Sequence, residues 1–296
     1  MQIRPAVPQD AKFITQLQEQ HYLNQWTFDA TELAHNIQNH PEHGRLVTEQ
    51  HGQVIGYASF APADLPTTLH VRFYAHPDHP EARKALHDAV VQQARGRYTA
   101  LESTLREDYA AAREFLESQG FQNSFQSYGA ALDLQNFDFQ PFEGLEERLF
   151  IEGFEVQQGT PEPSETLYQL YLQGFQDVPQ VPATRWSIET REAFEQTYWQ
   201  KGFVWFTVTY RNQVVALTLL DLRREDVQSE ITLTSRKFRH RGLCTLVKAR
   251  SLQWAKAEGH AKAGTGGAVI NLAMLKVNRR LGYQIEPMWL TYTCQI

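Results

Sequence analysis

Hydrophobic and polar residues alternate in several short segments of the second half of the chain, and these segments predict strands. Residues 204–209 and 214–222 flank a polar Arg-Asn turn, which is typical of an antiparallel hairpin. In residues 230–234, isoleucine and leucine alternate with threonine, so this strand has two different faces. Residues 154–157 and 289–296 are expected to be the first and last strands of the same sheet.

Longer hydrophobic periods predict the helices of this half. Residues 165–175 carry leucine and tyrosine on one face, and residues 242–257 repeat leucine and valine at helical spacing until Gly259 ends the helix. A third helix is expected over residues 269–281. Antiparallel strands that give way to alternating strands and helices predict an α+β fold with a mixed α/β sheet.

Two features of the first half recur in the second half at a constant distance. The hairpin at residues 51–56 returns at residues 211–216, and the helix that ends near Phe121 returns as a helix that ends near Tyr283. Both offsets are about 160 residues, which indicates two copies of one fold.

A terminal alternating strand follows each of the recurring helices, at residues 128–134 and 289–296. These landmarks predict a first domain over residues 1–135 and a second domain over residues 154–296. Residues 136–153 show no clean helical or strand period and are expected to form the linker.

Composition agrees with two ordinary globular domains. The chain has 296 residues, which is about twice the usual single-domain length of roughly 150. A formal charge of -6 gives no basic surface for nucleic acid, and the 2 cysteines cannot form a disulfide framework. No apolar run reaches the roughly 18 residues that span a bilayer, and the first residues lack the apolar core of a signal peptide. We therefore expect a cytoplasmic protein with no nucleic-acid or membrane partner.

The chemistry is expected at a basic, glycine-containing turn that leads from a strand directly into a helix. In this turn, Arg239, His240 and Arg241 precede Gly242. The start of a helix offers unpaired backbone N–H groups, and glycine lets a ligand approach the backbone closely, so this turn can hold a pyrophosphate. A basic turn that is merely solvated is the alternative interpretation.

The turn resembles the cofactor loop of the GNAT superfamily of acyl-CoA N-acyltransferases, in which Gln or Arg is followed by two small residues at fixed spacing. Arg239, Gly242 and Cys244 fill this pattern. Downstream, Asn271 with Met274 and the segment 278–283 are similar to the fourth-helix signature of the family. The order of these motifs resembles most the tandem subgroup that includes mycothiol synthase.

This resemblance implies two tandem GNAT-like domains, each a mostly antiparallel mixed sheet flanked by helices. It implies acetyl-CoA as the co-substrate, without a metal, in a cleft between the strand that ends at Thr234 and the strand near residues 262–265. The residues that it implies for acetyl-CoA binding are Leu233, Thr234, Arg239, His240, Arg241, Gly242, Leu243, Cys244, Thr245, Asn271, Met274 and Asn278.

The sequence departs from the family pattern at the proton donor. Many members have a tyrosine on the fourth helix, where this chain has Asn278, and Gly267 stands where an asparagine is common. Tyr283 and Tyr292 are candidate donors, although each is also typical of a core aromatic residue.

A carboxylate at the start of the strand 230–234 is the candidate base. Glu230 could accept the proton of the attacking amine, directly or through water, and Asp226 and Asp221 are alternatives. A solvated strand end is the competing interpretation of Glu230.

The first copy is expected to be degenerate. Residues 76–83 occupy the position of the cofactor loop, but Pro77 and Pro80 have no N–H to donate and Glu81 would repel a phosphate. Although His76, His79 and His87 lie nearby, no cysteine or compact carboxylate set supports a metal site.

We therefore expect an enzyme that transfers an acyl group to a primary amine of a small molecule or peptide, as a monomer or homodimer. The irregular, aromatic-bearing segment 177–186 is expected to line the acceptor side. A module that binds or senses acyl-CoA without turnover is the alternative, and the missing tyrosine favours it.

Overall fold

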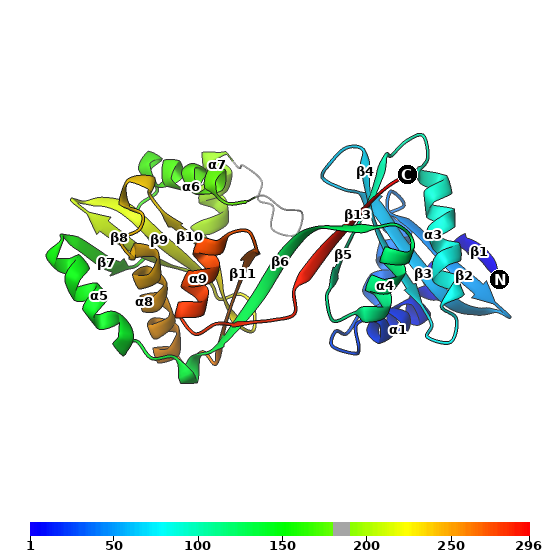
Figure 1. Ribbon diagram of the computed structural model, residues 1–296, viewed down its shortest axis with the longest axis horizontal. Coiled ribbons are helices and arrows are strands. Elements are labelled where there is room, and N and C mark those ends of the chain that lie inside the picture. Colours follow the sequence, from blue (N-terminus) through cyan, green and yellow to red (C-terminus); the bar gives the residue numbers. More distant parts are fainter. Residues whose placement is uncertain (180–189) are drawn as a thin grey trace. The chain divides into compact units, whose positions relative to one another are not determined.

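A mixed sheet with flanking helices forms the centre of each of two units (Figure 1). The computed structural model describes residues 1–179 and 190–296. Unit 1 comprises Met1–Gln126 and Trp289–Ile296, and unit 2 comprises Ser127–Met288. The chain therefore passes from unit 1 to unit 2 and returns at its end.

Unit 1 contains a sheet in which β1 to β4 are antiparallel neighbours, β4 and β5 run parallel, and β5 pairs antiparallel with β13. Its elements are β1 (Gln2–Pro5), α1 (Ala11–His21), α2 (Ala30–Asn39), β2 (Gly44–Gln50), β3 (Gln53–Pro62), β4 (Thr68–Ala75), α3 (Glu81–Ala94), β5 (Ala100–Arg106), α4 (Ala110–Ser118), the first part of β6 (Gln122–Asp133) and β13 (Trp289–Gln295).

Unit 2 repeats this arrangement. Strands β7 to β10 are antiparallel neighbours, β10 and β11 run parallel, and β11 pairs antiparallel with β6, which also pairs with β12. Its elements are the second part of β6, α5 (Gln140–Ile151), β7 (Phe154–Gln158), α6 (Glu165–Asp177), α7 (Arg191–Tyr198), β8 (Phe203–Tyr210), β9 (Gln213–Asp221), β10 (Val227–Thr234), α8 (Leu243–Ala257), β11 (Lys262–Ala268), α9 (Leu272–Arg280) and β12 (Gln284–Ile285). The predicted α+β class is confirmed.

Alternation along β9 explains why helices cover both faces of the sheet in unit 2. Ala216 and Leu220 belong to a core cluster that includes Leu246 of α8. Leu217 and Leu219 point the other way, into a cluster with residues of α6 and α7. Because successive strand side chains face opposite sides, a continuous apolar strand such as β9 needs helices on both faces.

The last strand was predicted to close the second copy, and this prediction is wrong. β13 pairs with β5 of unit 1 along its whole length, from Trp289 opposite Arg106 to Gln295 opposite Ala100. In unit 2, the neighbour of β11 is instead the second part of β6. A repeat in the sequence shows that a strand recurs, but strand pairing is non-local, so the repeat does not fix which sheet the strand joins.

The segment 136–153, expected to be an irregular linker, contains the helix α5. Pro141 stands in the first turn of this helix, where its missing N–H has no cost, and Phe142 and Leu149 are buried on one face. The helix packs against α8. The Asp and Phe residues just before it obscured the helical period.

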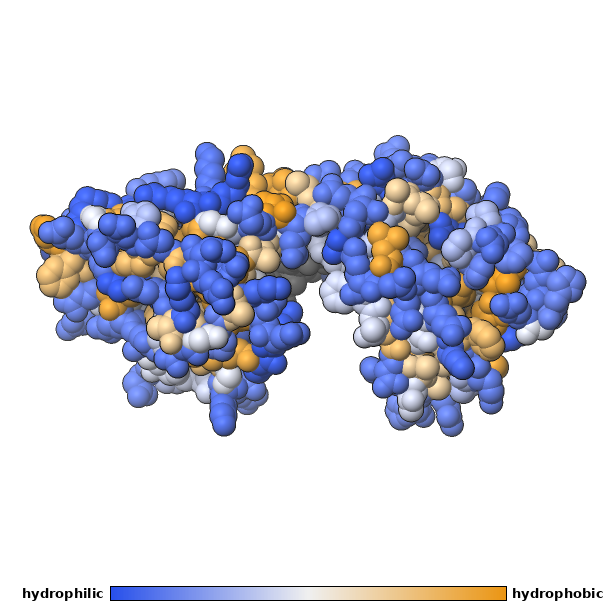
Figure 2. Space-filling view, turned by 90° about the horizontal axis from the view of Figure 1, so that it is seen from below, coloured by the Kyte–Doolittle hydropathy of each residue, from blue (hydrophilic) through white to orange (hydrophobic). Residues whose placement is uncertain are grey.

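The surface seen in Figure 2 is largely hydrophilic, with hydrophobic residues in separate small areas. The most exposed large hydrophobic side chains include Phe150 and Ile151 at the end of α5. Among the described residues, no helix is long and apolar enough to cross a membrane.

We expect that deletion of residues 289–296 opens unit 1 and leaves unit 2 protected. The deletion removes the partner of β5 and the burial of Leu290 and Tyr292, which are 6% and 3% exposed. Each such side chain contributes roughly 1.5–3 kcal/mol. Hydrogen exchange should rise in β5 but not in β9.

The variant Leu290→Ala tests the same contact with the chain intact and should cost about 2–5 kcal/mol of unfolding free energy. Leu272→Ala is its control, because Leu272 is 60% exposed. Increased exchange in β9 rather than in β5 after the deletion would contradict this assignment of β13.

Candidate functional site

A split between two parallel strands defines the centre of unit 2. β10 and β11 share only the pairs Val227 with Ala263 and Gln228 with Gly264. Beyond these pairs, β10 continues to Thr234 beside β9, and β11 continues to Ala268 beside β6. The two strands therefore present facing edges with no common hydrogen bonds, and a ligand can bind to the free backbone groups along them.

A β-bulge lies at the beginning of this split. The register of β10 against β9 shifts between Ser229 and Ile231, so Glu230 is the extra residue. Bulges twist a strand and re-aim its side chains. Glu230 is exposed at the start of the split.

The turn after β10 points backbone donors at one place. Gly242 caps α8 with φ 94°, and the helical bonding begins where the N–H of Leu246 bonds the carbonyl of Gly242. In the described part of the chain, the N–H groups of residues 240–245 have no backbone acceptor. A run of free amides at a helix start is a site for an anion.

Glycine is needed at position 242 for two reasons. Its φ lies in the left-handed region, which side chains disfavour, and a Cβ there would lie 2.9 Å from Cδ1 of Leu145. Helix α5 therefore sets the shape of the turn. Arg148 of α5 also bonds the carbonyl of Arg241 at 2.9 Å.

The arginines of the turn are paired with carboxylates. Asp177, at the end of α6, bonds Arg236 and Arg239, and these guanidinium groups lower the pKa of its carboxyl. Arg239 also donates to the carbonyl of Thr234 at 3.1 Å. Arg241 pairs with Glu152 at 3.2 Å. An anion would have to compete with these carboxylates for the side chains, but not for the amides.

Three buried hydroxyl groups near the split have no hydrogen-bond partner among the described residues: those of Ser229 and Thr234 on β10, and that of Tyr283. Buried polar groups without partners are unusual in a folded protein. An extended polar ligand with amide groups, such as pantetheine, could satisfy the two on β10. The residues present therefore fit acyl-CoA.

A buried polar network lies on the α8 side of β11. Lys248 is 1% exposed, and its Nζ donates to Oδ1 of Asn278 at 2.8 Å and to Oγ1 of Thr265 at 3.3 Å. Nδ2 of Asn278 donates to the hydroxyl of Tyr128 on β6 at 2.9 Å. Burial lowers the pKa of Lys248 to about 8. Both ends of the Asn278 amide are thus used inside the protein.

Other residues expected to bind the cofactor have structural contacts. The side chain of Asn271 caps α9 by accepting from the N–H of Met274 at 3.2 Å. Leu233 is buried against Gly174 of α6, so it offers only its backbone. Burial raises the pKa of Cys244 to about 11, which keeps its thiol neutral.

The structure separates the two candidate tyrosines. Tyr283 lies in unit 2 and is 3% exposed, and burial raises the pKa of its hydroxyl. Tyr292 lies in unit 1, where its hydroxyl donates to Glu117 at 2.6 Å. Burial first and Glu117 second raise the pKa of Tyr292 to about 12. Its proton is therefore already engaged.

The alternative bases also differ. Asp221 is buried and bonds Arg223 through both carboxylate oxygens at 2.8 Å, and this pairing lowers its pKa. A carboxylate held in this way is a poor proton acceptor. Asp226 lies in the turn before β10, where its carbonyl accepts from Gln228.

The corresponding loop of unit 1 has few free donors. Pro77 and Pro80 have no N–H. The N–H groups of five other loop residues already donate to acceptors within unit 1, namely those of His76, Asp78, His79, Ala82 and Arg83. His76 and His79 lie beside Asp78 and Glu81, their carboxylate partners. This loop therefore lacks the donor cluster of the turn in unit 2.

The split between β4 and β5 in unit 1 is largely filled. These strands pair from Thr68 to His70 and then diverge. The cavity there is only about 20 Å³ and is lined by aromatic residues, among them Tyr22 and Phe115. That volume holds about one water molecule. Burial lowers the pKa of His21, which also lines it, to about 3.

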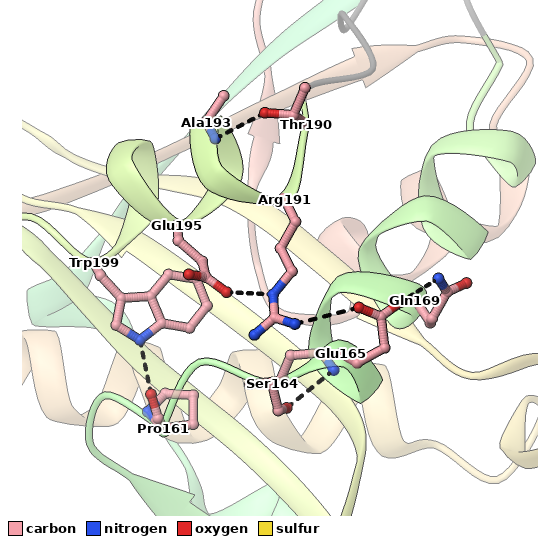
Figure 3. Close-up of polar contacts among 10 residues, drawn as sticks. Pro161, Ser164, Glu165, Gln169, Thr190, Arg191, Ala193, Glu195 and Trp199 are labelled. Carbon is pink, nitrogen blue, oxygen red and sulfur yellow. Dashed lines mark hydrogen bonds and ion pairs between the residues drawn. The ribbon is translucent and has the colours of Figure 1, made fainter.

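The segment expected to line the acceptor side is 177–186, of which residues 180–186 lie outside the described residues. Figure 3 shows the polar contacts on both sides of the gap. Arg191 at the start of α7 pairs with Glu195 at 2.7 Å and with Glu165 of α6 at 3.4 Å. Trp199 donates to the carbonyl of Pro161 at 2.8 Å. These contacts join α7 to α6.

A family model matches part of unit 1. Residues 11–121 match the model of the acetyltransferase (GNAT) family. The match lies in unit 1, whereas the sequence motifs were found in unit 2. No curated protein sequence matches this chain.

Solved structures match over nearly the whole chain. A GCN5-related N-acetyltransferase from Sphaerobacter thermophilus has 14% identity and a TM-score of 0.66, covering 99% of this chain and 95% of that one. A tandem GNAT protein from the clavulanic acid biosynthesis pathway has 17% identity and a TM-score of 0.64, covering 99% and 98%. A glucosamine N-acetyltransferase region of a fungal GH3 β-N-acetylglucosaminidase has 13% identity and a TM-score of 0.71, covering 99% of this chain and 38% of that one.

The chain is thus a two-unit protein with a tandem GNAT fold. The match to the GNAT family model is confined to residues 11–121, in its first unit. The comparisons do not distinguish the mycothiol synthase subgroup.

Two members of the buried network, Tyr128 and Lys248, are not among the site residues expected from the sequence. A signal for Lys248 is visible in the sequence, because it interrupts the apolar side of a helix between Val247 and Leu252. Tyr128 has no such signal, since only the pairing of β6 with β11 brings it to the site.

We expect Lys248 to make the protein more stable at pH 9 than at pH 7. The folded protein releases this proton near pH 8, whereas the unfolded chain keeps it to about 10.5, so stability rises with pH between these values. One pH unit inside this window adds about 1.4 kcal/mol. Urea unfolding at pH 7, 8 and 9 measures the gain.

In Lys248→Met this gain should disappear, whereas in Lys256→Met, which changes an exposed lysine of the same helix, it should persist. The neighbouring Cys244 acts in the opposite direction above its ordinary pKa of 9, which is why the comparison stops at pH 9. An equal pH slope in wild type and Lys248→Met would show that Lys248 does not titrate in this range.

Proposed function

We propose that the protein is an N-acetyltransferase that uses acyl-CoA, most simply acetyl-CoA, and transfers the acyl group to a primary amine of a small molecule or peptide. One observation carries the proposal. The split between β10 and β11 leads directly into a glycine turn whose amides, at residues 240–245, are free among the described residues. Such an arrangement suits an extended ligand that ends in a pyrophosphate.

The residues of unit 2 have distinct parts in binding. The amides of residues 240–245 hold the pyrophosphate, and β10 beyond its bulge offers backbone groups and the hydroxyl of Thr234 to the pantetheine arm. Acyl-CoA supplies the activated thioester. Arg239 and Arg241 strengthen the site when they exchange their carboxylate partners for phosphate oxygens.

Glu230 is the base in this proposal. It is exposed at the bulge, where the split opens, while Asp221 is held by Arg223. As the amine nitrogen attacks the thioester carbon, its proton passes to the Glu230 carboxylate, directly or through one water molecule. The new C–N bond forms and the C–S bond breaks.

We place the protein in the cytoplasm, where acetyl-CoA and free amines are both available. The likeness of the motifs around Asn271 and Asn278 to the tandem subgroup with mycothiol synthase favours a small-molecule acceptor. Amino sugars therefore belong in any acceptor panel, beside peptide N-termini and free amino acids.

The proposal is tested by calorimetry with acetyl-CoA and by a thiol-release assay with an amine panel. We expect one acetyl-CoA per chain, because most backbone N–H groups in the loop of unit 1 already donate hydrogen bonds within that unit. We also expect Gly242→Ala to weaken binding by about 10- to 100-fold, roughly 1.4–3 kcal/mol. The positive φ at this position disfavours alanine, and the added Cβ would press against Leu145, so both effects disturb the turn.

Gly259→Ala is a matched control. Gly259 follows the C-terminal end of α8 and has φ 86°, and no atom lies within 4 Å of an added Cβ. Alanine at this position therefore has a similar backbone strain but no steric contact. The affinity of this variant for acetyl-CoA should stay at the wild-type value. Two equivalent sites, or equal losses in both variants, would contradict the placement in unit 2. Binding without thiol release for any amine would favour the acyl-CoA-binding module.

The variant Glu230→Gln should lower kcat by about 10²- to 10⁴-fold and leave the affinity for acetyl-CoA nearly unchanged, because only proton acceptance is lost. The acidic limb of the profile of kcat/KM against pH should disappear with it. Glu225→Gln, in the exposed turn before β10, is the control. If Glu230→Gln keeps full activity and the acidic limb, the amine reacts without this carboxylate.

A further inference from the structure

We propose that Tyr128 donates the proton to the departing thiolate, and that Asn278 and Lys248 position its hydroxyl for this step. The inference rests on the proposed function and gives a source for the proton that the fourth helix does not supply. It assigns the proton donor to β6, which lies before residue 154, where the predicted second domain begins.

Strand pairing places Tyr128 on β6, across β11 from the split. Its partner across the β6–β11 ladder is Gly267, which lies three residues beyond Gly264, the last residue of β11 that pairs with β10. An added Cβ on Gly267 would lie 3.6 Å from the tyrosine hydroxyl. Because Gly267 has no side chain, no side chain at this position of β11 contacts the hydroxyl. Gly267, which stands where an asparagine is common in the family, is therefore part of the surroundings of the Tyr128 hydroxyl.

The hydrogen bonds fix which way the Asn278 amide points. As an ammonium group, Lys248 can only donate, so the atom of Asn278 that faces it is the carbonyl oxygen, at 2.8 Å. The amide nitrogen must then face Tyr128, and it donates to the phenol oxygen at 2.9 Å. Tyr128 is consequently an acceptor in this bond.

A tyrosine whose oxygen accepts a hydrogen bond still has its own proton to give. Among the described residues, none accepts the proton of Tyr128. Tyr128 is only 3% exposed, so water does not compete freely for the hydroxyl proton. In contrast, Tyr292 already gives its proton to Glu117, and the hydroxyl of Tyr283 has beside it that of Ser229, which lowers its pKa against the rise caused by burial.

The network also favours the product of proton transfer. The tyrosinate that forms keeps the hydrogen bond from Asn278, and the Lys248 ammonium polarises that amide from its other end. Burial raises the pKa of Tyr128, and the bond from Asn278 opposes this shift. Lys248 faces Cys244 on its own helix and the ring of Tyr283, whose centroid is 5.3 Å from its Nζ.

The step balances as follows. The amine nitrogen forms the C–N bond, the C–S bond breaks, and the sulfur leaves with the electron pair. The proton of the Tyr128 hydroxyl moves to the sulfur and gives free thiol. The proton lost by the amine goes to Glu230, and exchange with water returns both groups to their starting states.

Tyr128→Phe tests the proposal, because it removes the hydroxyl and keeps the ring. We expect kcat with acetyl-CoA to fall by about 10²- to 10³-fold, while the dissociation constant for acetyl-CoA stays within about twofold of wild type. The defect should shrink to less than about tenfold with 4-nitrophenyl acetate, whose leaving group needs no proton. Tyr57→Phe, which removes the hydroxyl of a tyrosine buried in unit 1, should leave kcat unchanged.

Asn278→Leu tests the positioning part. Loss of the donor to the phenol oxygen raises the pKa of Tyr128, so the alkaline limb of the profile of kcat against pH should move to higher pH. A residue with a merely structural role would lower thermal stability without moving this limb. Melting temperatures of all variants show which of them are folded.

The outcomes separate this inference from the proposed function. If wild type releases no thiol with any amine, the proposed function fails first. If wild type is active and Tyr128→Phe is folded and equally active, or is equally impaired with both acyl donors, Tyr128 is not the proton donor. A reduced kcat that recovers with 4-nitrophenyl acetate supports it.

Discussion

The short parallel pairing between β10 and β11 is the constraint on which the rest of unit 2 depends. Two residue pairs hold the strands together, and each strand then follows a different neighbour, β9 or β6. If the pairing continued, the backbone groups of both edges would bond each other and no ligand could use them. Divergence keeps them free, and the bulge at Glu230 begins where the strands part.

The split requires a strand on the outer side of β11, and the chain supplies it from an unexpected place. The second part of β6 pairs with all of β11, from Lys262 to Ala268. Gly266 allows this close approach, because a Cβ there would lie 2.9 Å from the carbonyl oxygen of Tyr128. In unit 1 the equivalent support comes from β13, at the far end of the sequence. Both sheets therefore need contacts between residues distant in sequence, which slow folding.

Much of the fold could be predicted from the sequence, because the signals are local. The β8–β9 hairpin and the helices α6 and α8 appear where periodicity places them, within a few residues. The grouping of the strands could not be predicted in this way. The periodicity of β13 is the same whichever sheet it joins, so only its pairing with β5 reveals its unit. Helix α5 was missed because its apolar face, with Phe142 and Leu149, is narrow.

Some parts of the candidate site could likewise be predicted from the sequence, and others could not. The glycine turn before α8 could be recognised, since Gly242 and its basic neighbours are consecutive in sequence. The partners of the arginines, Asp177 and Glu152, lie on other helices and carry no local signal. The network of Lys248, Asn278 and Tyr128 joins α8, α9 and β6, so it emerges only from the tertiary structure.

The two units show why a family match and a cluster of free backbone donors need not coincide. Unit 1 contains the segment that matches the GNAT family model, yet its loop has prolines at 77 and 80 and its split is filled by aromatic side chains. Such a match reflects the fold, and the fold alone does not establish a functional site. Among the described residues of unit 2, free amides, a left-handed glycine and unpartnered hydroxyls occur beside one split. These properties depend on a few backbone positions, which is why unit 2 is the better place for the chemistry although the family model matches unit 1.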